Sequence, residues 1–483
     1  MEKHPVVIIG AGPAGLTSAY QLVKQGIKPI VLEKADKVGG IARTEIYKGY
    51  RFDIGGHRFY TKVEEVQKLW QEVLGEDFLK VPRMSRIYYR NRFFNYPLSI
   101  FNTLSNIGII ESLLILLSYF KAQLWPCPQE DTLDQWVTNR FGSRLYKIFF
   151  KTYTEKVWGI PCNKIQAEWA AQRIKGLSLK TAILNALFGS NDTKTLIKEF
   201  DYPALGPGMM WEKFQEAVDS KGGQVCLNTG VIRIEREGNH INKIIAQKDG
   251  ETFQIAGENF ISTMPVTTLI DRLDPPAPDE VIQAAKSLNY RNFIIVSLII
   301  DAKDLFPDNW IYVHSSEVKV GRIQNFKNWS PEMVPDANKT CLGMEYFCSY
   351  GDEIWTMSDS ELLDLATTEI ARLGLAEANK VEDGVVLRQA KAYPVYDRDY
   401  RQHLQVIQKY LENFDNLQTI GRNGMHRYNN QDHSMLTGML AVRNLLGENN
   451  DLWEVNTERS YYEEFTKDDL KNQKALQVLE TKS

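Results

Sequence analysis

The sequence predicts an α/β protein with more than one domain, and three observations carry that prediction. Residues 5–34 have the pattern of a strand, a glycine-rich turn, a helix and a second strand. Residues 62–190 place aromatic side chains at helical spacings with few turn signals, and strand-like runs return from residue 224. The 483 residues also exceed what one ordinary core usually holds.

The first element is a complete βαβ unit. Gly10, Gly12 and Gly15 form a GxGxxG pattern between the strand "PVVIIG" and the helix "LTSAYQLVKQG". Glycines in that pattern allow a tight turn, a close backbone approach to a pyrophosphate and close helix packing. The start of the helix, which includes Ala14, points free N–H groups at the phosphates. This context favours a bound dinucleotide over a bare structural turn.

The second strand ends in an acidic residue. Glu33 follows Gly15 by 18 residues, and a carboxylate there accepts hydrogen bonds from ribose hydroxyls and repels a 2′-phosphate. Lys34 follows it in "EKADKVGGIARTE", where Gly40 and Arg43 supply a second glycine turn and a basic residue. An extended flavin needs both near its pyrophosphate, whereas a plain nicotinamide dehydrogenase does not. FAD is therefore the predicted cofactor.

Two further stretches fit an FAD site. "FDIGGHRFYT" contains Gly55, Gly56 and His57, and it fits a second close backbone approach with His57 near the isoalloxazine ring. A loop histidine bonded to the backbone explains His57 equally well. In "NTGVIRIE" the Val231 backbone is expected at the adenine, although the end of an ordinary core strand gives the same pattern.

The remaining elements follow in chain order. Residues 62–190 are expected to be a helical insertion, and residues 224–264 a meander divided by Gly-Asn and Asp-Gly turns. Strands of a second sheet are expected within 292–326. Then follow a helix near 358–374, a strand at "GVVLRQAKAYPVY", a helix at 399–413, a strand and turn at "LQTIGRNG", a helix from about 433 to 446 and a charged tail.

Net charge and cysteine content exclude some classes of binding partner. A net charge of −4 lacks the basic footprint of nucleic-acid binders, so no nucleic acid is expected and any anionic ligand needs a local cluster of Arg or Lys. Five scattered cysteines show no zinc-type pairing, which predicts reduced thiols, no structural zinc and a cytoplasmic protein. The N-terminus also lacks the leader and cleavage site of a signal peptide.

One stretch raises the question of a membrane. "NIGIIESLLILLSYFKAQLW", residues 106–125, is apolar, but Glu111 and Lys121 leave it short of the roughly 18 to 20 apolar residues that a span needs. The prediction is a buried helix and no transmembrane span. Peripheral contact with a membrane surface through 106–125 stays the alternative.

The stretch "RYNNQDHSML", residues 427–436, combines residues that a metal site, a catalytic dyad or a helix cap would use. Asp432 and His433 are adjacent and no further cluster of ligands lies nearby in sequence, so no metal site is predicted. Their side chains diverge at a helix start, which disfavours a dyad. Asn430 or Asp432 can instead cap the following helix, whose positive end would stabilise negative charge on a flavin.

Four blocks carry a resemblance to a known family. They are "YTEKVWGIPCNKIQAEWAAQRI", "DYPALGPGMMW", "GRIQNFKNWSP" and "GRNGMHRYNNQDHS", and they occur in this order. With them the chain, over roughly residues 5–446, resembles the flavin-dependent UDP-galactopyranose mutases, the eukaryotic type more than the compact bacterial one. That family lies within the wider group of protoporphyrinogen oxidases and amine oxidases.

The resemblance implies a reaction without net redox change. Reduced flavin attacks the anomeric carbon of a nucleotide-diphosphate sugar through N5 and expels the diphosphate. The flavin-bound sugar then opens, recloses in the other ring form and is recaptured. The cofactor is FAD, active when reduced, with NADPH or NADH as candidate reductants.

The resemblance also implies roles for individual residues. Arg173 and Arg322 correspond to two arginines that hold the diphosphate, and with His57 they are the predicted catalytic residues. Tyr393 and Tyr428 correspond to phenols that reach the same phosphates. Taken locally, each arginine could equally be a surface salt-bridge residue, and each of these two tyrosines an aromatic core residue. Core packing is also an open alternative for the remaining substrate residues, Tyr96, Trp158, Trp310 and Tyr312. Gly421, Arg422, Asn430, Gln431 and Ser434 are expected at the flavin.

Three departures from the family pattern leave the substrate open. Glu199 stands where the eukaryotic-type mutases carry an amide, so an acid there could change the ligand. The chain is shorter between Tyr428 and Asn430, and "KAYPVYD" has the look of the protoporphyrinogen oxidases. The alternative function is therefore an FAD-dependent oxidase or desaturase of the protoporphyrinogen or amine oxidase type.

The predicted architecture is an α/β fold with a Rossmann-type FAD-binding domain, an inserted helical domain and a second, antiparallel-sheet substrate domain. The FAD-binding domain is expected in three parts, 1–61, 196–265 and 393–447. The helical substrate or lid domain takes 62–195, the antiparallel-sheet domain 266–392 and the charged tail 448–483. The sequence does not indicate an oligomeric state.

Overall fold

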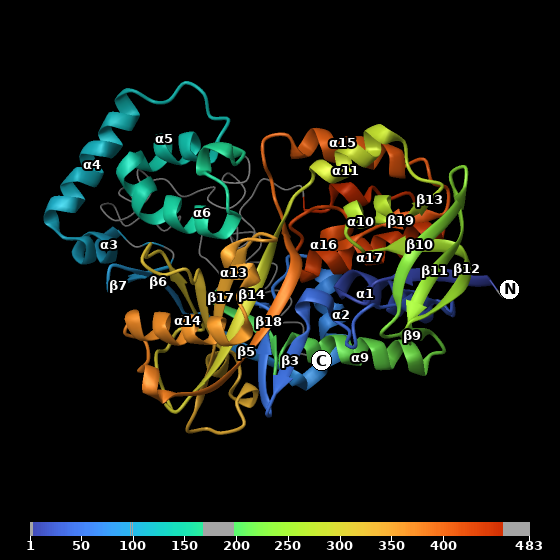
Figure 1. Ribbon diagram of the computed structural model, residues 1–483, viewed down its shortest axis with the longest axis horizontal. Helices are drawn as coiled ribbons and strands as arrows, with labels where there is room; N and C mark the ends of the chain where they lie inside the picture. The colour runs from blue at the N-terminus through green and yellow to red at the C-terminus, as the bar shows by residue number, and fades with distance from the viewer. Residues whose placement is uncertain (1–2, 97, 99, 168–197, 457–483) are drawn as a thin grey trace, which may run out of the picture.

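The computed structural model describes residues 3–96, 98, 100–167 and 198–456 (Figure 1). Its first elements are β1 (Lys3–Ile9), α1 (Pro13–Lys24) and β2 (Ile30–Leu32), with β1 and β2 parallel. The predicted βαβ unit is therefore confirmed.

An eight-stranded sheet is built around this unit. Its parallel part runs β9 (Gln224–Cys226), β2, β1, β12 (Glu251–Ser262) and β19 (Leu417–Thr419). The antiparallel part is the predicted meander of β10 (Gly230–Glu237), β11 (His240–Lys248) and β12, with β13 (Leu273–Asp274) at the edge. Gly238 and the pair Asp249–Gly250 turn with positive φ, as predicted for these turns.

Helices cover both faces of this sheet. One core holds α1, α2 (Glu64–Leu74), α9 (Pro207–Ser220) and α17 (Gln431–Leu445). The other holds α10 (Val266–Asp271), α11 (Asp279–Ser287) and α15 (Tyr400–Leu411). Helices on both faces of a largely parallel sheet are the Rossmann-like arrangement that the sequence predicted.

A seven-stranded sheet forms the other half of the molecule. Its order is β18 (Val381–Pro394), β14 (Tyr290–Ile300), β17 (Thr340–Cys348), β16 (Arg322–Asn325), β15 (Trp310–Val313), β6 (Ser85–Tyr89) and β7 (Arg92–Asn95). All neighbours are antiparallel except β15 and β6. Helix α14 (Asp359–Arg372) packs on one face, and the hairpin β3 (Thr44–Tyr47) and β4 (Tyr50–Asp53) on the other.

The prediction that helices fill residues 62–190 is wrong in its first third. After α2, the chain forms β5 (Phe78–Pro82), which pairs with β8 (Glu199–Pro203), and then β6 and β7. Arg90 and Asn91 both have positive φ and form the tight turn between β6 and β7. This turn lacks glycine, so the usual hairpin signal is missing from the sequence. The described helical part runs from α3 (Ile100–Ile107) through α4 (Ile109–Leu124), α5 (Leu133–Leu145) and a π turn to α6 (Thr152–Trp158).

The prediction that 106–125 forms a buried helix is also wrong. Helix α4 packs on α5 through Ser112, Ile115, Tyr119 and Ala122, but most of its other apolar side chains are exposed. Composition alone could not separate the two faces, because both are apolar. Among the described residues, no helix is long and apolar enough to cross a membrane.

The five cysteines have free thiols, and three of them are buried (Cys127, Cys162, Cys226, Cys341 and Cys348). The described ranges hold no group of three or more His, Cys, Asp or Glu arranged to bind a metal ion. Residues of both sheets alternate along the chain, so the two halves interleave in sequence. The exact domain boundaries remain a prediction.

Candidate functional site

A cavity of about 1310 Å³ lies between the two halves and is lined by residues of both sheets and of the helical part. Pockets for one small ligand are typically about 300–1,000 Å³, so this cavity has room for a cofactor and a second ligand. Most of the predicted cofactor residues line it: Gly10, Gly12, Ala14, Glu33, Lys34, Gly40, Arg43, Gly55, Gly56, His57, Val231, Gly421, Arg422, Asn430, Gln431 and Ser434. The described substrate residues do so too: Tyr96, Trp158, Trp310, Tyr312, Arg322, Tyr393 and Tyr428.

One side of the cavity is a wall of glycine backbone, here called the glycine wall and made of Gly10, Gly12 and Gly40. Gly10 has φ +100° and Gly40 has φ +56°, and residues with a side chain rarely adopt such positive values. A Cβ built on Gly12 would meet only the Gly40 Cα, at 3.9 Å. Two glycine turns therefore lie against each other at the N-terminus of α1, where a pyrophosphate can approach free N–H groups.

Gly15 is the one described member of the predicted cofactor set that does not line the cavity. A Cβ built on it would lie 1.9 Å from the Gly10 carbonyl oxygen. Gly15 therefore lets α1 pack against the turn, which is the third role of the GxGxxG pattern. On the other side of α1, a Cβ on Gly438 of α17 would lie 2.6 Å from the Ala14 oxygen, so α1 and α17 also pack closely.

Glu33 holds the backbone of the glycine wall. Its Oε2 accepts a hydrogen bond from the Ala11 N–H at 2.8 Å and its Oε1 from the Ala35 N–H at 2.9 Å. Each carboxylate oxygen has a second lone pair for a ligand hydroxyl. Nearby, the Arg43 guanidinium bonds Glu45, the Gly40 carbonyl and Gln389 of β18, so it links the glycine wall to the opposite sheet.

Gly55 and Gly56, the second glycine pair, have a packing role that the sequence did not reveal. A Cβ on Gly56 would lie 2.9 Å from Gln324 Nε2 and 3.3 Å from the Trp329 ring. A Cβ on Gly55 would come within 3.7 Å of an Arg322 nitrogen. These glycines let the seven-stranded sheet approach the loop before His57. Whether a cofactor also approaches them stays a prediction.

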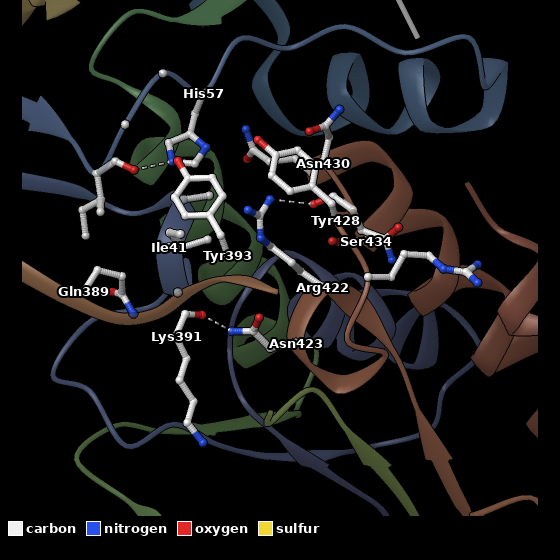
Figure 2. A pocket seen from close by; sticks show the side chains of 18 of the residues that line it. Ile41, His57, Gln389, Lys391, Tyr393, Arg422, Asn423, Tyr428, Asn430 and Ser434 are labelled. Carbon is white, nitrogen blue, oxygen red and sulfur yellow. Dashed lines mark hydrogen bonds between the residues drawn. The ribbon is translucent and has the colours of Figure 1, made fainter. Parts of the chain in front are cut away.

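His57 lies in this loop and lines the cavity (Figure 2). Its Nε2 is 2.9 Å from the Ile54 carbonyl oxygen, an acceptor only, so the neutral ring carries its proton there. Burial, with smaller contributions from Arg422 and Arg322, lowers the pKa of His57 to about 4. Near pH 7 His57 is therefore neutral and a hydrogen-bonding group, not a cation.

Helix α17 points its N-terminus at the cavity. Asn430 is the N-cap and forms a capping box with His433, with the Asn430 N–H donating to His433 Nδ1 at 3.3 Å. Of the two caps that the sequence allowed, the structure uses Asn430. Gln431 accepts a hydrogen bond from the Trp211 indole, and Ser434 begins the helical hydrogen bonds. The positive end of the helix thus faces the cavity.

Arg322 belongs to a buried ion pair on the opposite side. Its Nε donates to Glu345 Oε2 at 2.5 Å, and Gln324 Nε2 donates to the other carboxylate oxygen at 2.8 Å. Glu345 is fully buried. Burial opposes the charge, but the Glu345 carboxylate outweighs it and raises the pKa of Arg322 well above its usual value. Arg322 is therefore a permanent cation at the cavity wall.

A second guanidinium lies between two phenol rings, as Figure 2 shows. The Arg422 Cζ is 4.0 Å from the Tyr428 ring centroid and 4.9 Å from that of Tyr393. Backbone carbonyls of Ala392 and Asn429 fix the guanidinium. Burial raises the pKa of Tyr393, which keeps this phenol protonated and able to donate a hydrogen bond.

Aromatic rings complete this side. The Trp158 ring lies 6.5 Å from Tyr393 and 6.4 Å from Tyr428, centroid to centroid. Farther along, Tyr96 lies 5.0 Å from Tyr312, and Trp310 lies 6.3 Å from Tyr312 and packs on Trp329. We call the set Trp158, Tyr312, Arg322, Tyr393, Arg422 and Tyr428 the aromatic wall. The sequence left open whether Trp310 lines the ligand site or packs in the core. In the structure it lines the cavity and is also part of the hydrophobic core.

Two residues singled out in the sequence do not join the site. Arg173 lies outside the described residues, so its predicted role stays a prediction. Glu199 is exposed at the first position of β8, paired with Pro82, and does not line the cavity. Direct contact between Glu199 and a ligand in this cavity is therefore not supported.

Sequence reasoning missed two residues of the site. Glu345 sits in an apolar strand run, where its charge looks like an exposed position, and only the antiparallel register that pairs Arg322 with Glu345 reveals the contact. Tyr153 lines the cavity and stacks on His314 at 4.8 Å. Tyr153 was part of the quoted "YTEKVWG" block, so its position in that block was the available signal.

Known proteins resemble the chain over much of its length. The model of the NAD(P)-binding Rossmann-like domain matches residues 8–73, and that of the flavin-containing amine oxidoreductases matches residues 191–422. Both matches cover parts of the glycine wall or of the sheets behind the cavity. The chain is thus similar to the flavin-containing amine oxidoreductases over a little under half of its length.

The sequence relatives of the chain have names that indicate different functions. The putative flavin-containing monoamine oxidase AofH of Mycobacterium tuberculosis is 26% identical over 58% of this chain and 61% of its own length. The 15-cis-phytoene desaturase of Capsicum annuum is 26% identical over 76% of this chain and 64% of its own length. The chain thus spans a little under two thirds of these relatives.

The comparison with solved structures adds a protein with a third function, different from those of the two sequence relatives. A crystal structure of reduced UDP-galactopyranose mutase superposes with a TM-score of 0.82 at 21% identity, over 95% of this chain and all of that one. At that identity the likeness shows the fold alone. The matching family is described as flavin-containing, and FAD is the cofactor here. The open space before Gly12, the helix end of α17 and the Glu33 carboxylate fit its pyrophosphate, ring and ribose.

Proposed function

We propose that the protein is a flavin-dependent mutase that interconverts the pyranose and furanose forms of a nucleotide-diphosphate sugar, with UDP-galactopyranose and UDP-galactofuranose as the first substrates to test. One observation carries the proposal: the aromatic wall holds two guanidinium groups, Arg322 and Arg422, facing the space beside the predicted flavin. An apolar substrate would offer no acceptor to the guanidinium N–H groups that Glu345, Ala392 and Asn429 leave unused, at a desolvation cost.

The residues of the aromatic wall suit a diphosphate leaving group. Arg322 stays charged because Glu345 is its buried partner, and Glu345 takes only one edge of the guanidinium fork. The remaining N–H groups can bind phosphate oxygens in the bidentate manner that guanidinium allows. The protonated phenol of Tyr393 adds a hydrogen bond, and the Tyr428 hydroxyl faces the same side.

These groups would act where charge develops. When the bond between the anomeric carbon and the phosphate oxygen breaks, negative charge grows on the diphosphate, and fixed cations stabilise it without reorganisation. Reduced FAD, when bound, supplies the nucleophile for the anomeric carbon. The N-terminus of α17, capped by Asn430, would stabilise negative charge at the cofactor. His57 is neutral and leaves the positive charge to the arginines.

UDP binding tests the proposal directly. UDP is expected to bind the oxidised holoprotein, and Arg322→Ala to weaken that binding about 100-fold, because a desolvated charge pair at a ligand contributes roughly 2–5 kcal/mol. Isothermal titration calorimetry measures both. Arg144→Ala is the matched control, since Arg144 is an ion-paired surface arginine of the helical part. Equal UDP affinity for wild type and Arg322→Ala would contradict the proposal.

A second candidate is an FAD-dependent oxidase or desaturase acting on an apolar substrate. It is favoured by the names of the sequence relatives, a monoamine oxidase and a phytoene desaturase, and by the helical end of the cavity, which is lined by Leu98, Ile115, Leu116, Phe141, Leu145 and Phe150. Steady oxygen uptake, or reduction of a quinone, with an amine or a polyene would support this candidate. The same assay with UDP-sugars alone is expected to show no electron transfer if the mutase proposal holds.

A further inference from the structure

The outer face of α4 exposes an unusual amount of apolar surface. Eight large side chains of α4 and its C-terminal cap are exposed, seven of them by more than half: Ile109, Ile110, Leu113, Leu114, Leu117, Phe120, Leu124 and Trp125. Together they expose on the order of 1,000 Å², whereas the largest apolar patch on a typical monomer is about 300–600 Å². We call these eight residues the α4 outer face.

The helix under this face is firmly held. Ser112, Ile115, Tyr119 and Ala122 are buried on the inner side, against α5. At Gly142 of α5, a Cβ would lie 2.7 Å from the Tyr119 nitrogen, so the two backbones are in close contact. The outer face is therefore a preformed surface on a packed helix, at the edge of the molecule in Figure 1.

The charge around this face is positive in an otherwise acidic chain. Residues 86–151 contain eight Lys and Arg but four Asp and Glu, whereas the whole chain has a net charge of −4. Lys121, Lys147 and Lys151 are exposed in this region. Glu111 is the single acidic residue of α4, and it is neutralised by Arg144 at 2.5 Å. An anionic surface is the complementary partner.

The kind of surface follows from the shape and the length of the face. Helix α4 has 16 residues, fewer than the about 20 that cross a bilayer, so a membrane contact of this face would lie along the membrane surface. Leu, Ile and Phe on the face, Trp125 at its end and Lys121 beside it are typical of helices at the boundary between headgroups and acyl chains. A second copy of the chain fits less well, because a twofold contact would place the same positive region against itself.

We propose that the α4 outer face docks on the surface of a lipid bilayer that contains anionic phospholipid. The inner side of the same helix lines the cavity through Ile115 and Leu116. Docking would therefore place the helical wall of the cavity, and with it the site between the two sheets, at the membrane surface. The proposal does not depend on which reaction the site performs.

Vesicle co-sedimentation of the full-length holoprotein tests the proposal. We expect binding to phosphatidylcholine vesicles that contain about a third of phosphatidylglycerol, weaker binding to pure phosphatidylcholine, and a further loss in high salt. Leu117→Glu combined with Phe120→Glu is expected to reduce binding at least tenfold. Ile46→Glu, on the exposed side of β3, is the matched control and is expected to bind like wild type.

Two other measurements keep the test decisive. Circular dichroism and the flavin absorbance are expected to be unchanged in the double variant, because both side chains are exposed. No binding of the wild type to either vesicle, or equal binding of the double variant, would overturn the proposal. So would concentration-dependent self-association in sedimentation velocity that the double variant abolishes while vesicles bind neither protein, since the face would then be covered by a second copy.

Discussion

The two walls of the cavity are built in different ways. The glycine wall is made of backbone, and its members Gly10, Gly12 and Gly40 lie within about thirty residues of one another in the chain. The aromatic wall is made of side chains, and its members come from α6, β15, β16, β18, the short helix α16 (Gly421–Gly424) and the loop before α17. A backbone site can be recognised from spacing, whereas a side-chain site requires the register of distant strands.

The largest expected effect separates a packing role from a ligand-contact role between two glycines of the GxGxxG pattern, Gly15 and Gly12. Gly15→Ala is expected to prevent folding, because its Cβ would lie 1.9 Å from the Gly10 oxygen. Gly12→Ala meets no protein atom nearer than 3.9 Å, so the chain is expected to fold but to lose FAD. Urea unfolding and the flavin absorbance of the purified proteins measure the two effects. Tight FAD binding by Gly12→Ala would show that no pyrophosphate lies against that backbone.

The aromatic wall is expected to respond through charge. Arg322→Ala leaves Glu345 buried without its partner and is expected to cost about 3–5 kcal/mol of unfolding free energy. Adding Glu345→Gln is expected to restore most of that stability without restoring UDP affinity. Urea unfolding and calorimetry on the single and double variants distinguish the two roles. Full recovery of UDP affinity in the double variant would mean that Arg322 does not touch the ligand.

A smaller effect appears in the pH dependence of stability. Burial lowers the pKa of His426 to about 4 from the usual 6.5. The unfolded chain therefore takes up a proton that the native protein refuses, and stability is lost as the pH falls from about 7 towards 4. At pH 5 the resulting loss of unfolding free energy is about 2 kcal/mol for a fully buried histidine.

The variant His426→Asn isolates this contribution. His426 has φ +44°, which Asn tolerates. The loss of unfolding free energy between pH 7 and pH 5 is expected to be about 2 kcal/mol smaller in the variant than in wild type. The comparison cancels the opposite contribution of Asp53, whose pKa is raised by burial to about 7. His240→Asn, at an exposed site, is the control. An identical loss in wild type and His426→Asn would contradict the burial argument.

The smallest expected effect concerns the influence of the α17 N-terminus on the flavin. Asn430→Ala and Ser358→Ala each remove an N-cap, from α17 and α14, and each is expected to cost about 1 kcal/mol of stability. Of these two helices, α17 faces the cavity and α14 does not. We therefore expect Asn430→Ala, but not Ser358→Ala, to lower the midpoint potential of the flavin. Spectroelectrochemical titration of both variants measures this. Equal potentials in both variants would remove α17 from the electrostatics of the site.

The sequence predicted the parts of the fold that depend on local signals. The βαβ unit, the Gly238 and Asp249–Gly250 turns, and most of the strands and helices after residue 290 were predicted, but the central strand β17 was not. The strands β6 and β7 were missed because Arg90 and Asn91 make their turn without glycine. The exposure of α4 was missed because both of its faces are apolar. Glu345 was missed because its partner lies 23 residues away on the next strand of the sheet.

The central claim is that the cavity isomerises a nucleotide-diphosphate sugar beside a reduced flavin. The most direct measurement is anaerobic incubation of the dithionite-reduced holoprotein with UDP-galactofuranose, followed by chromatography of the nucleotide sugars. The proposed function predicts conversion to UDP-galactopyranose over many turnovers while the flavin stays reduced, and none with the oxidised protein. No conversion in either redox state, together with electron transfer from an amine or a polyene, would contradict it.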